Sequence, residues 1–265
     1  MAINLYDKSN HRVLLFSDLV KGEGIQSNQL VVIDNGQSAL FDPGGELTFT
    51  ALNMAMAYHQ PISNLTYLFA SHQDPDILSS LSSWFRYTSA KVVIPSVWCR
   101  FLEHLVPHFM SHYGSKRFIS VADGGTRIPL GHGEIIVLPA HFLHSIGNVS
   151  FYDPISKILF SGDIGASIVS GDAGQAVQDF DRHIGKMLGF HQRYMVSNKV
   201  CRFWVNMIRQ LEINLLIPQH GQYFVGKPMI EKFLAWLENL DCGIDRMTQY
   251  HYRIPDSLGL TATAT

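Results

Sequence analysis

Four short apolar runs in this sequence each lead directly into histidine or aspartate. The runs are LTYLFA (65–70), EIIVLPA (134–140), KILFSG (157–162) and INLLIP (213–218). Their length and composition predict buried β-strands. The residues that follow them are His72, Asp74, Asp76, His144, Asp163 and His220. A fold that pairs these strands would place all six side chains on loops near the sheet edges, where a rigid scaffold usually holds its functional site.

The rest of the chain mixes strands with helices. Four more segments have strand patterns, at 30–34, 38–42, 91–95 and 148–153. The first two flank Asn35-Gly36, a dipeptide typical of tight hairpins. Three segments have helical patterns, at 47–59, 172–211 and 229–240. Hairpins together with crossovers favour mixed sheets with helices outside them over an all-parallel doubly wound fold.

Composition excludes several classes of protein. Hydrophobic residues make up 46% of the chain and charged residues 16%, which is the balance of a folded chain rather than a disordered one. The formal net charge of −2 offers no basic excess for nucleic acid or for an anionic membrane surface. No apolar run approaches the roughly 18 residues that would span a bilayer, and the N-terminus lacks the pattern of a signal peptide. A cytoplasmic protein is therefore expected.

Chain length and cysteine usage are consistent with this expectation. A chain of 265 residues suits one large layered domain, which we expect over residues 1–254. The tail at 255–265 is short, polar and terminal, so we expect it to be loose. The cysteines are Cys99, Cys201 and Cys242. Because they are odd in number and far apart, we expect neither a disulfide framework nor a cysteine zinc site.

The six polar residues at the strand ends form a plausible metal-binding set. Neutral imidazoles and three carboxylates carry a combined charge of −3, so two divalent ions with one bridging hydroxide would give a neutral centre. Asp163 is the natural bridge because it stands alone after its strand. A mixed set of nitrogen and oxygen ligands suits iron, manganese or zinc. A single such residue is most often a cap or turn residue, but six at four strand ends make coincidence a poor explanation.

The order of the motifs resembles the metallo-β-lactamase fold superfamily. The motifs are DPGG (42–45), HQDPD (72–76), HFLHSIGN (141–148), FSGD (160–163) and PQHG (218–221). The resemblance extends over nearly the whole chain. It implies an α/β fold of the αββα sandwich type, with two mixed sheets flanked by helices. It also implies a binuclear metal site at the edge between the sheets.

Two departures from the superfamily pattern select a branch. Zinc hydrolases of the superfamily typically have HxHxDH in the first ligand loop, whereas this chain has Asp74 at the second position and Ile77 at the last. A carboxylate at the second position is typical of flavodiiron proteins, which use HxExDH and reduce oxygen or nitric oxide. Those enzymes carry a flavodoxin-like domain after the metal domain, and this chain ends soon after its last expected helix. The sequence is thus most similar to the stand-alone oxygen-binding diiron proteins (ODP), which are linked to oxygen or iron sensing.

Carried over position by position, the resemblance implies a ligand set. His72, Asp74 and His144 would bind the first iron, Asp76 and His220 the second, and Asp163 would bridge them. It implies two iron ions, for which zinc or manganese could substitute, and no flavin in this chain. Three residues are candidates for groups beside bound O2, although packing or capping explains each more simply: Asn148, His191 and Tyr194.

The resemblance leaves the type of activity open. The implied ligand is O2, with NO as an alternative. The protein would act as a sensor with a signalling partner or as a flavin-free reductase with an external electron donor. A homodimer is also left open. The alternative is a zinc-dependent hydrolase of a thioester, lactone or phosphodiester, in which a metal-bound hydroxide attacks the substrate. That alternative rests on the fold resemblance alone.

Overall fold

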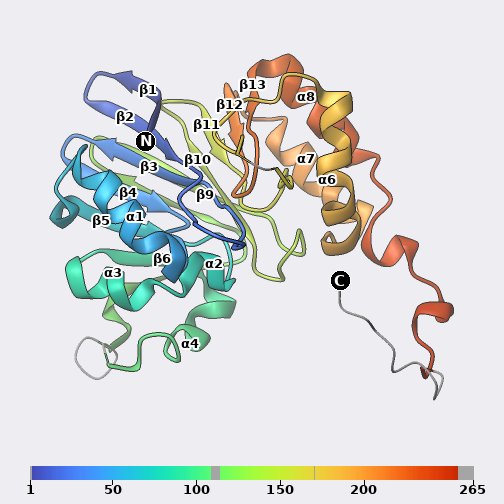
Figure 1. Ribbon diagram of the computed structural model, residues 1–265, viewed down its shortest axis with the longest axis horizontal. Coiled ribbons are helices and arrows are strands. Elements are labelled where there is room, and N and C mark those ends of the chain that lie inside the picture. The colour runs from blue at the N-terminus through green and yellow to red at the C-terminus, as the bar shows by residue number, and fades with distance from the viewer. Residues whose placement is uncertain (1, 109–113, 170, 256–265) are drawn as a thin grey trace.

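Alternating side chains in the strands build two β-sheets that pack face to face (Figure 1). In β2 (His11–Phe16), Val13 and Leu15 lie in the cluster between the sheets, whereas Leu14 and Phe16 lie under the helices of the first sheet. Successive strand residues point to opposite faces, so one strand supplies both layers. The computed structural model describes residues 2–108, 114–169 and 171–255, and these form three hydrophobic layers.

The first sheet follows the order of the chain from one edge to the other. Its strands are β1 (Ile3–Lys8), β2, β3 (Gln29–Asp34), β4 (Gln37–Phe41), β5 (Leu65–Phe69), β6 (Lys91–Pro95) and β7 (Phe118–Val121). Pairing is antiparallel from β1 to β4 and parallel from β4 to β7, so the sheet is mixed.

The second sheet has the order β13-β12-β11-β10-β9-β8. Its strands are β8 (Thr126–Leu130), β9 (Gly133–Pro139), β10 (Val149–Asp153), β11 (Ile158–Phe160), β12 (Leu215–Ile217) and β13 (Phe224–Val225). β10 is antiparallel to both β9 and β11, and β11 is parallel to β12. The strands β9, β11 and β12 therefore run in one direction, and their carboxyl ends meet at one edge.

Helices cover the outer face of each sheet (Figure 1). The first sheet is covered by α1 (Glu46–Ala57), α2 (Pro75–Leu78), α3 (Leu81–Tyr87) and α4 (Cys99–Leu102). The second is covered by α6 (Phe180–Tyr194), α7 (Asn198–Ile208) and α8 (Gly226–Glu238). Short 3₁₀ turns occur at η1 (Ile62–Asn64), η2 (Ser96–Trp98), η3 (Gly114–Arg117), η4 (Gly243–Arg246) and η5 (Gln249–His251). The layers are those of an αββα sandwich, which confirms the predicted fold class.

The helical pattern over 172–211 corresponds to two helices, α6 and α7, and not to the whole segment. Helix α6 begins at Phe180. The side chain of Asp179 caps its N-terminus by accepting a hydrogen bond from the backbone N–H of Arg182 at 3.3 Å. The helix ends at Met195, whose backbone is extended and pairs with Leu143 in an isolated β-bridge. A contact with a distant loop thus divides the segment, which helical periodicity alone does not reveal.

The remaining expectations concern membrane-spanning segments, the C-terminal tail and the number of domains. Within the ranges that the structure describes, no helix combines the length and the apolar character that crossing a membrane would require. Apart from Pro255, the tail expected at 255–265 lies outside the described residues. The single domain over 1–254 stays a prediction.

Candidate metal centre

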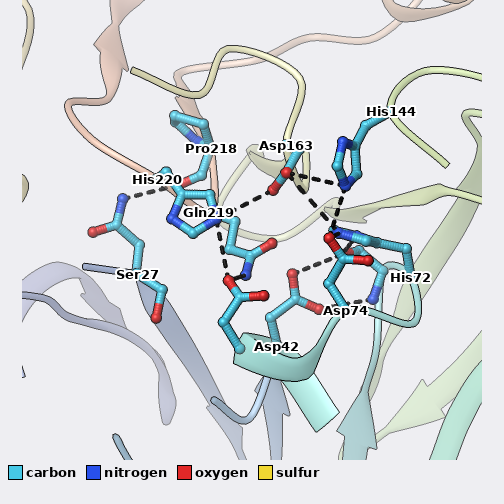
Figure 2. Close-up of polar contacts among 12 residues, drawn as sticks. Ser27, Asp42, His72, Asp74, His144, Asp163, Pro218, Gln219 and His220 are labelled. Carbon is cyan, nitrogen blue, oxygen red and sulfur yellow. Dashed lines mark hydrogen bonds and ion pairs between the residues drawn. The ribbon is translucent and has the colours of Figure 1, made fainter. Parts of the chain in front are cut away.

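The six predicted ligands lie at the carboxyl ends of strands from both sheets. His72 and Asp74 follow β5, His144 follows β9, Asp163 follows β11 and His220 follows β12. Figure 2 shows that these side chains converge on one small volume. Asp76 is the exception to the prediction that all six lie on loops, because it occupies the first turn of α2. Pro75 precedes it at the first helical position, where a missing N–H does no harm.

The ligand atoms form two groups. In the first, Nε2 of His144 lies 3.0 Å and Nε2 of His72 lies 3.6 Å from Oδ2 of Asp74. These three residues each offer a donor atom within 4.8 Å of the others. In the second group, Nε2 of His220 lies 3.2 Å from Oδ2 of Asp76. The grouping matches the two ligand sets that the resemblance implies.

Asp163 lies between the two groups. Its Oδ2 is 3.5 Å from Nε2 of His144 and 4.0 Å from Nε2 of His72. Its Oδ1 is 3.6 Å from Nε2 of His220. One carboxylate therefore presents one oxygen to each group, which is the placement that a bridging ligand requires.

Unpaired buried atoms show that the residues fit a metal. Nε2 of His72 and Oδ1 of Asp163 are buried, and neither finds a hydrogen-bond partner in the described part of the chain. Buried polar atoms are normally paired, so two that face the same small volume without a partner suit a bound cation. Imidazole nitrogens with carboxylate oxygens are a donor set that iron accepts.

Outer hydrogen bonds fix which nitrogen of two histidines faces the centre. Nδ1 of His220 donates to the carbonyl oxygen of Gln26 at 2.7 Å, so its Nε2 is free to face the carboxylates. Nδ1 of His72 lies 2.8 Å from Oγ of Ser71. That hydroxyl donates to Oδ2 of Asp42 at 2.7 Å, and it therefore accepts from His72. Partners of this kind orient metal-binding histidines in many proteins.

Asp42 is the residue that the early DPGG motif contributes to the site. It is fully buried, and its Oδ1 accepts the backbone N–H of Ser71 at 2.7 Å. Burial raises the pKa of Asp42 to about 7, although the charge of His72 and the hydrogen bonds from Ser71 act in the opposite direction. The motif thus holds the first ligand loop in place and supplies no ligand itself.

The charges of the site favour protonated histidines before metal binds. Burial alone would lower the pKa of His220, but the charge of Asp163 and the hydrogen bond to Asp76 outweigh it and raise the pKa to about 9. Burial alone would raise the pKa of Asp74, yet hydrogen bonds from His144 and His72 hold it well below its usual range. Near neutral pH the metal-free site therefore carries a proton on Nε2 of His220 as well as on Nδ1.

Iron binding is expected to displace this proton, because Nε2 of His220 cannot hold a proton and a metal together. Below the pKa of about 9, the apparent affinity for ferrous iron should rise with pH. One displaced proton gives a slope of roughly tenfold per pH unit. Anaerobic titrations between about pH 6 and pH 8 measure that slope. An affinity that does not change with pH would contradict the assignment of His220 as a ligand.

The loop that carries His144 is held in an unusual backbone conformation. Phe142 and His144 both have positive φ angles, of 66° and 77°. Between them, Leu143 is fully buried, and its carbonyl accepts a hydrogen bond from the side chain of Asn148 at 2.5 Å. Asn148, a candidate for a group beside O2, thus stabilises the ligand loop. Backbone strain that the surroundings enforce is common at functional sites.

Aromatic residues of α6 position the imidazole of His144. Its ring centroid lies 5.6 Å from that of Phe190 and 5.1 Å from that of Tyr194. Tyr194 remains half exposed, so it is at once a neighbour of the ligand and part of the surface. This contact supports its prediction as a group near the centre.

His191 has a packing role. Its Nδ1 donates to the carbonyl of Met187 at 2.9 Å, and its Nε2 accepts the backbone N–H of Gly165 at 2.9 Å. Burial lowers the pKa of His191 to about 4, so the ring is neutral and both nitrogens are occupied. The ring anchors the backbone two residues beyond Asp163.

Two glutamines that sequence reasoning missed hold the carboxylate ligands. Gln73 donates from Nε2 to Oδ1 of Asp74 at 3.0 Å and accepts a hydrogen bond from Ser145 at 2.6 Å. Gln219 donates from Nε2 to Oδ2 of Asp76 at 2.9 Å. Gln73 thereby ties the loop after β5 to the His144 loop. Because it occupies Oδ1 of Asp74, it leaves Oδ2 to face the histidines. The only sequence signal was that each glutamine adjoins a ligand.

Replacing Gln73 with leucine is expected to lower the affinity of the first group for iron by about 10- to 100-fold, the usual effect of losing a hydrogen-bond partner of a ligand. Gln219→Leu is the matched variant and should weaken the second group instead. Anaerobic titration with ferrous iron, resolved into two binding steps, tests both. Equal effects of the two variants on both steps would show that neither glutamine acts on its own carboxylate.

A cleft of about 730 Å³ borders the site. Its lining includes His144, Ser145 and Tyr194, together with Asp241 and Gly243, which follow α8. The His144 loop is therefore reachable from the surface through this cleft.

Comparison with known proteins gives consistent matches. The family profile "ODP family beta lactamase" matches residues 25–221. The chemotaxis sensor ODP, solved as a peroxy diiron species, is 34% identical, with a TM-score of 0.82 over 92% of this chain and 97% of that one. Its apo state from T. denticola is also 34% identical, with a TM-score of 0.80 over 93% and 97%.

A more distant structure shares only the fold. The rubredoxin oxygen:oxidoreductase of Desulfovibrio gigas is 16% identical, with a TM-score of 0.75. The match covers 90% of this chain and 61% of that one. Among curated protein sequences, none matches this chain.

Proposed function

The chain belongs to the ODP family of β-lactamase-fold proteins, and from this premise we propose that it is a diiron protein that binds O2 as a sensor. The observation that carries the proposal is the position of Asp163, with one oxygen toward each group of ligands. When bound, a pair of ferrous ions supplies O2 with a binding site and with two electrons. The relatives that share a third of their sequence with this chain are chemotaxis sensors, which favours sensing.

The proposed ligand set is asymmetric. His72, Asp74 and His144 would hold one ion together with Asp163. Asp76 and His220 would hold the other, also together with Asp163. The second group thus offers fewer protein donors among the described residues, and positions without a protein ligand are those that an external molecule can take.

Ile77 explains the asymmetry. It occupies the position where flavodiiron proteins have the last histidine of their motif, and it is a fully buried residue of α2 in the core under the first sheet's helices. Its side chain packs with the helices of the first sheet, away from water, and it has no donor atom. The chain thereby uses this position for packing.

A sensor also needs a way to pass the state of its metal centre to another molecule. We propose that a signalling partner in the cytoplasm reads the state of the centre, and that the cleft beside His144 gives access to it. An external reductase in place of that partner would make the protein a reductase of O2 or NO.

The proposal is tested by loading metal-free protein with ferrous iron under anaerobic conditions. We expect two irons per chain and, after air is admitted, a visible absorption band that persists without added reductant. Zinc-loaded protein, which should stay colourless in air, is the control. A band that bleaches quickly while reductant is consumed would identify a reductase. Failure to take up iron, with zinc retained and esters hydrolysed, would identify a hydrolase and overturn the proposal.

A further inference from the structure

Two cysteines that are far apart in sequence meet in the core of the second helical layer. Sγ of Cys201, on α7, lies 3.9 Å from Sγ of Cys242, and both thiols are free and fully buried. Cys242 follows α8 and begins a segment, residues 242–251, that we call the C-terminal strap. The packing of α7 against α8 brings the two thiols together, although they lie 41 residues apart in sequence.

The strap is joined by hydrogen bonds to the loop that carries His144. The N–H of Ile244 in the strap donates to the carbonyl of Val196 at 2.8 Å. The N–H of Val196 donates in turn to the carbonyl of Phe142 at 3.1 Å. The strap, the connection between α6 and α7, and the ligand loop therefore lie side by side. Two hydrogen bonds in series therefore connect the strap to the loop that carries His144.

The segment that carries Cys242 borders the cleft beside His144. The residues on either side of Cys242, Asp241 and Gly243, line that cleft. The next strap residue, Ile244, is 62% exposed. Exposed segments with few buried contacts open locally at low free energy, and such an opening would uncover the thiols.

We propose that Cys201 and Cys242 form a reversible dithiol–disulfide site that hydrogen peroxide oxidises, fastening the C-terminal strap to α7. The Cys242 thiolate attacks one oxygen of the peroxide, and the O–O bond breaks to give a sulfenic acid and hydroxide. The Cys201 sulfur then attacks the Cys242 sulfur and displaces water. The hydroxide takes up the proton that Cys242 released, so one peroxide becomes two waters as two thiols become one disulfide.

The positions of the two thiols assign their roles. Cys242 lies between Asp241 and Gly243, which line the cleft, whereas Cys201 lies on α7 within the helical layer. Peroxide that enters from the cleft therefore meets Cys242 first, so Cys242 attacks and Cys201 resolves. The two sulfurs must approach by about 2 Å to reach bonding distance. The strap supplies this movement more readily than the helix.

The test uses the full chain, stripped of metal with a chelator so that iron chemistry plays no part. In a Cys99→Ser background, reduced protein is treated with hydrogen peroxide under anaerobic conditions, alkylated after unfolding, and digested. We expect a peptide pair linked through Cys201 and Cys242 that dithiothreitol separates. Cys201→Ser and Cys242→Ser should each abolish the link.

Digestion of the native protein gives a second readout. Arg246 lies in the strap and is exposed, so trypsin should cleave after it when the strap opens. The disulfide should slow this cleavage by about tenfold or more in the wild type and leave it unchanged in Cys201→Ser. If the serine variants fail to fold, the mass experiment on the Cys99→Ser protein still decides. Thiols that stay reduced at peroxide levels that oxidise Cys99 in the wild type would overturn the proposal, as would links between chains only.

Discussion

Replacing Asp163 with alanine is expected to abolish binding of both iron ions. The side chain is 4% exposed and presents Oδ2 to one group of ligands and Oδ1 to the other. Its loss removes a charged donor from each ion and leaves the second group with only Asp76 and His220. We expect the affinity of each ion to fall by at least about 100-fold. Metal analysis after anaerobic loading and desalting measures the iron that remains.

Two variants separate bridging from ordinary ligation. Asp74→Ala should abolish binding of the first ion only, because Asp74 contacts His72 and His144, whereas His220 pairs with Asp76. Asp163→Asn keeps the shape of the side chain but leaves it one oxygen instead of two, so it should retain as little iron as Asp163→Ala. Two irons retained by Asp163→Ala would refute the bridge.

The residues that converge at the candidate metal centre could be predicted because their signal lies along the sequence. A buried strand is visible as an apolar run, and a histidine or aspartate after such a run stands out. The outer partners were not predicted in the same way. Ser71, Gln73 and Asp42 are ordinary polar residues in sequence, and only the folded chain shows that Asp42 reaches the loop after β5.

The elements that sequence analysis missed have weak local signals. β13 has only two residues, and β8 includes Pro129, a residue that strands tolerate mainly at sheet edges such as the one β8 forms. The break between α6 and α7 depends on the bridge from Met195 to Leu143, a contact between segments about 50 residues apart in sequence. The thiol pair depends in the same way on the packing of α7 against α8. Both features depend on contacts between distant segments, which local sequence patterns do not reveal.

A buried charged cluster away from the metal centre joins the two sheets. His11, at the start of β2, lies between Asp34 of the first sheet and Asp153 of the second. Its Nε2 is 2.7 Å from Oδ2 of Asp153, and its Nδ1 is 3.3 Å from Oδ1 of Asp34. Asp34 also accepts the backbone N–H of Gly133 at 3.0 Å. The ring is 3% exposed, so its charge depends on both carboxylates.

Asp153→Ala is expected to lower the free energy of unfolding by about 3–5 kcal/mol, the usual result of removing one partner from a buried ion pair. Burial alone would lower the pKa of His11, but Asp153 and Asp34 outweigh it and raise the pKa above 6.5. The stabilisation from His11 is therefore complete below pH 6.5 and is lost as the pH rises through its folded pKa. Urea unfolding at several pH values measures both effects, and Asp153→Ala should flatten the loss of stability above pH 6.5.

A double variant distinguishes pairing from packing. In His11→Leu/Asp153→Leu, apolar side chains replace both partners, and such replacements of buried ion pairs are often neutral or stabilising. We therefore expect the double variant to recover most of the stability that Asp153→Ala loses, and to show no pH dependence from His11. If Asp153→Ala were as stable as the wild type, the His11 charge would not need its partner. If instead the double variant were as unstable as Asp153→Ala, the loss would come from the hydrogen bonds that Asp153 accepts from Ser156 and Ile155.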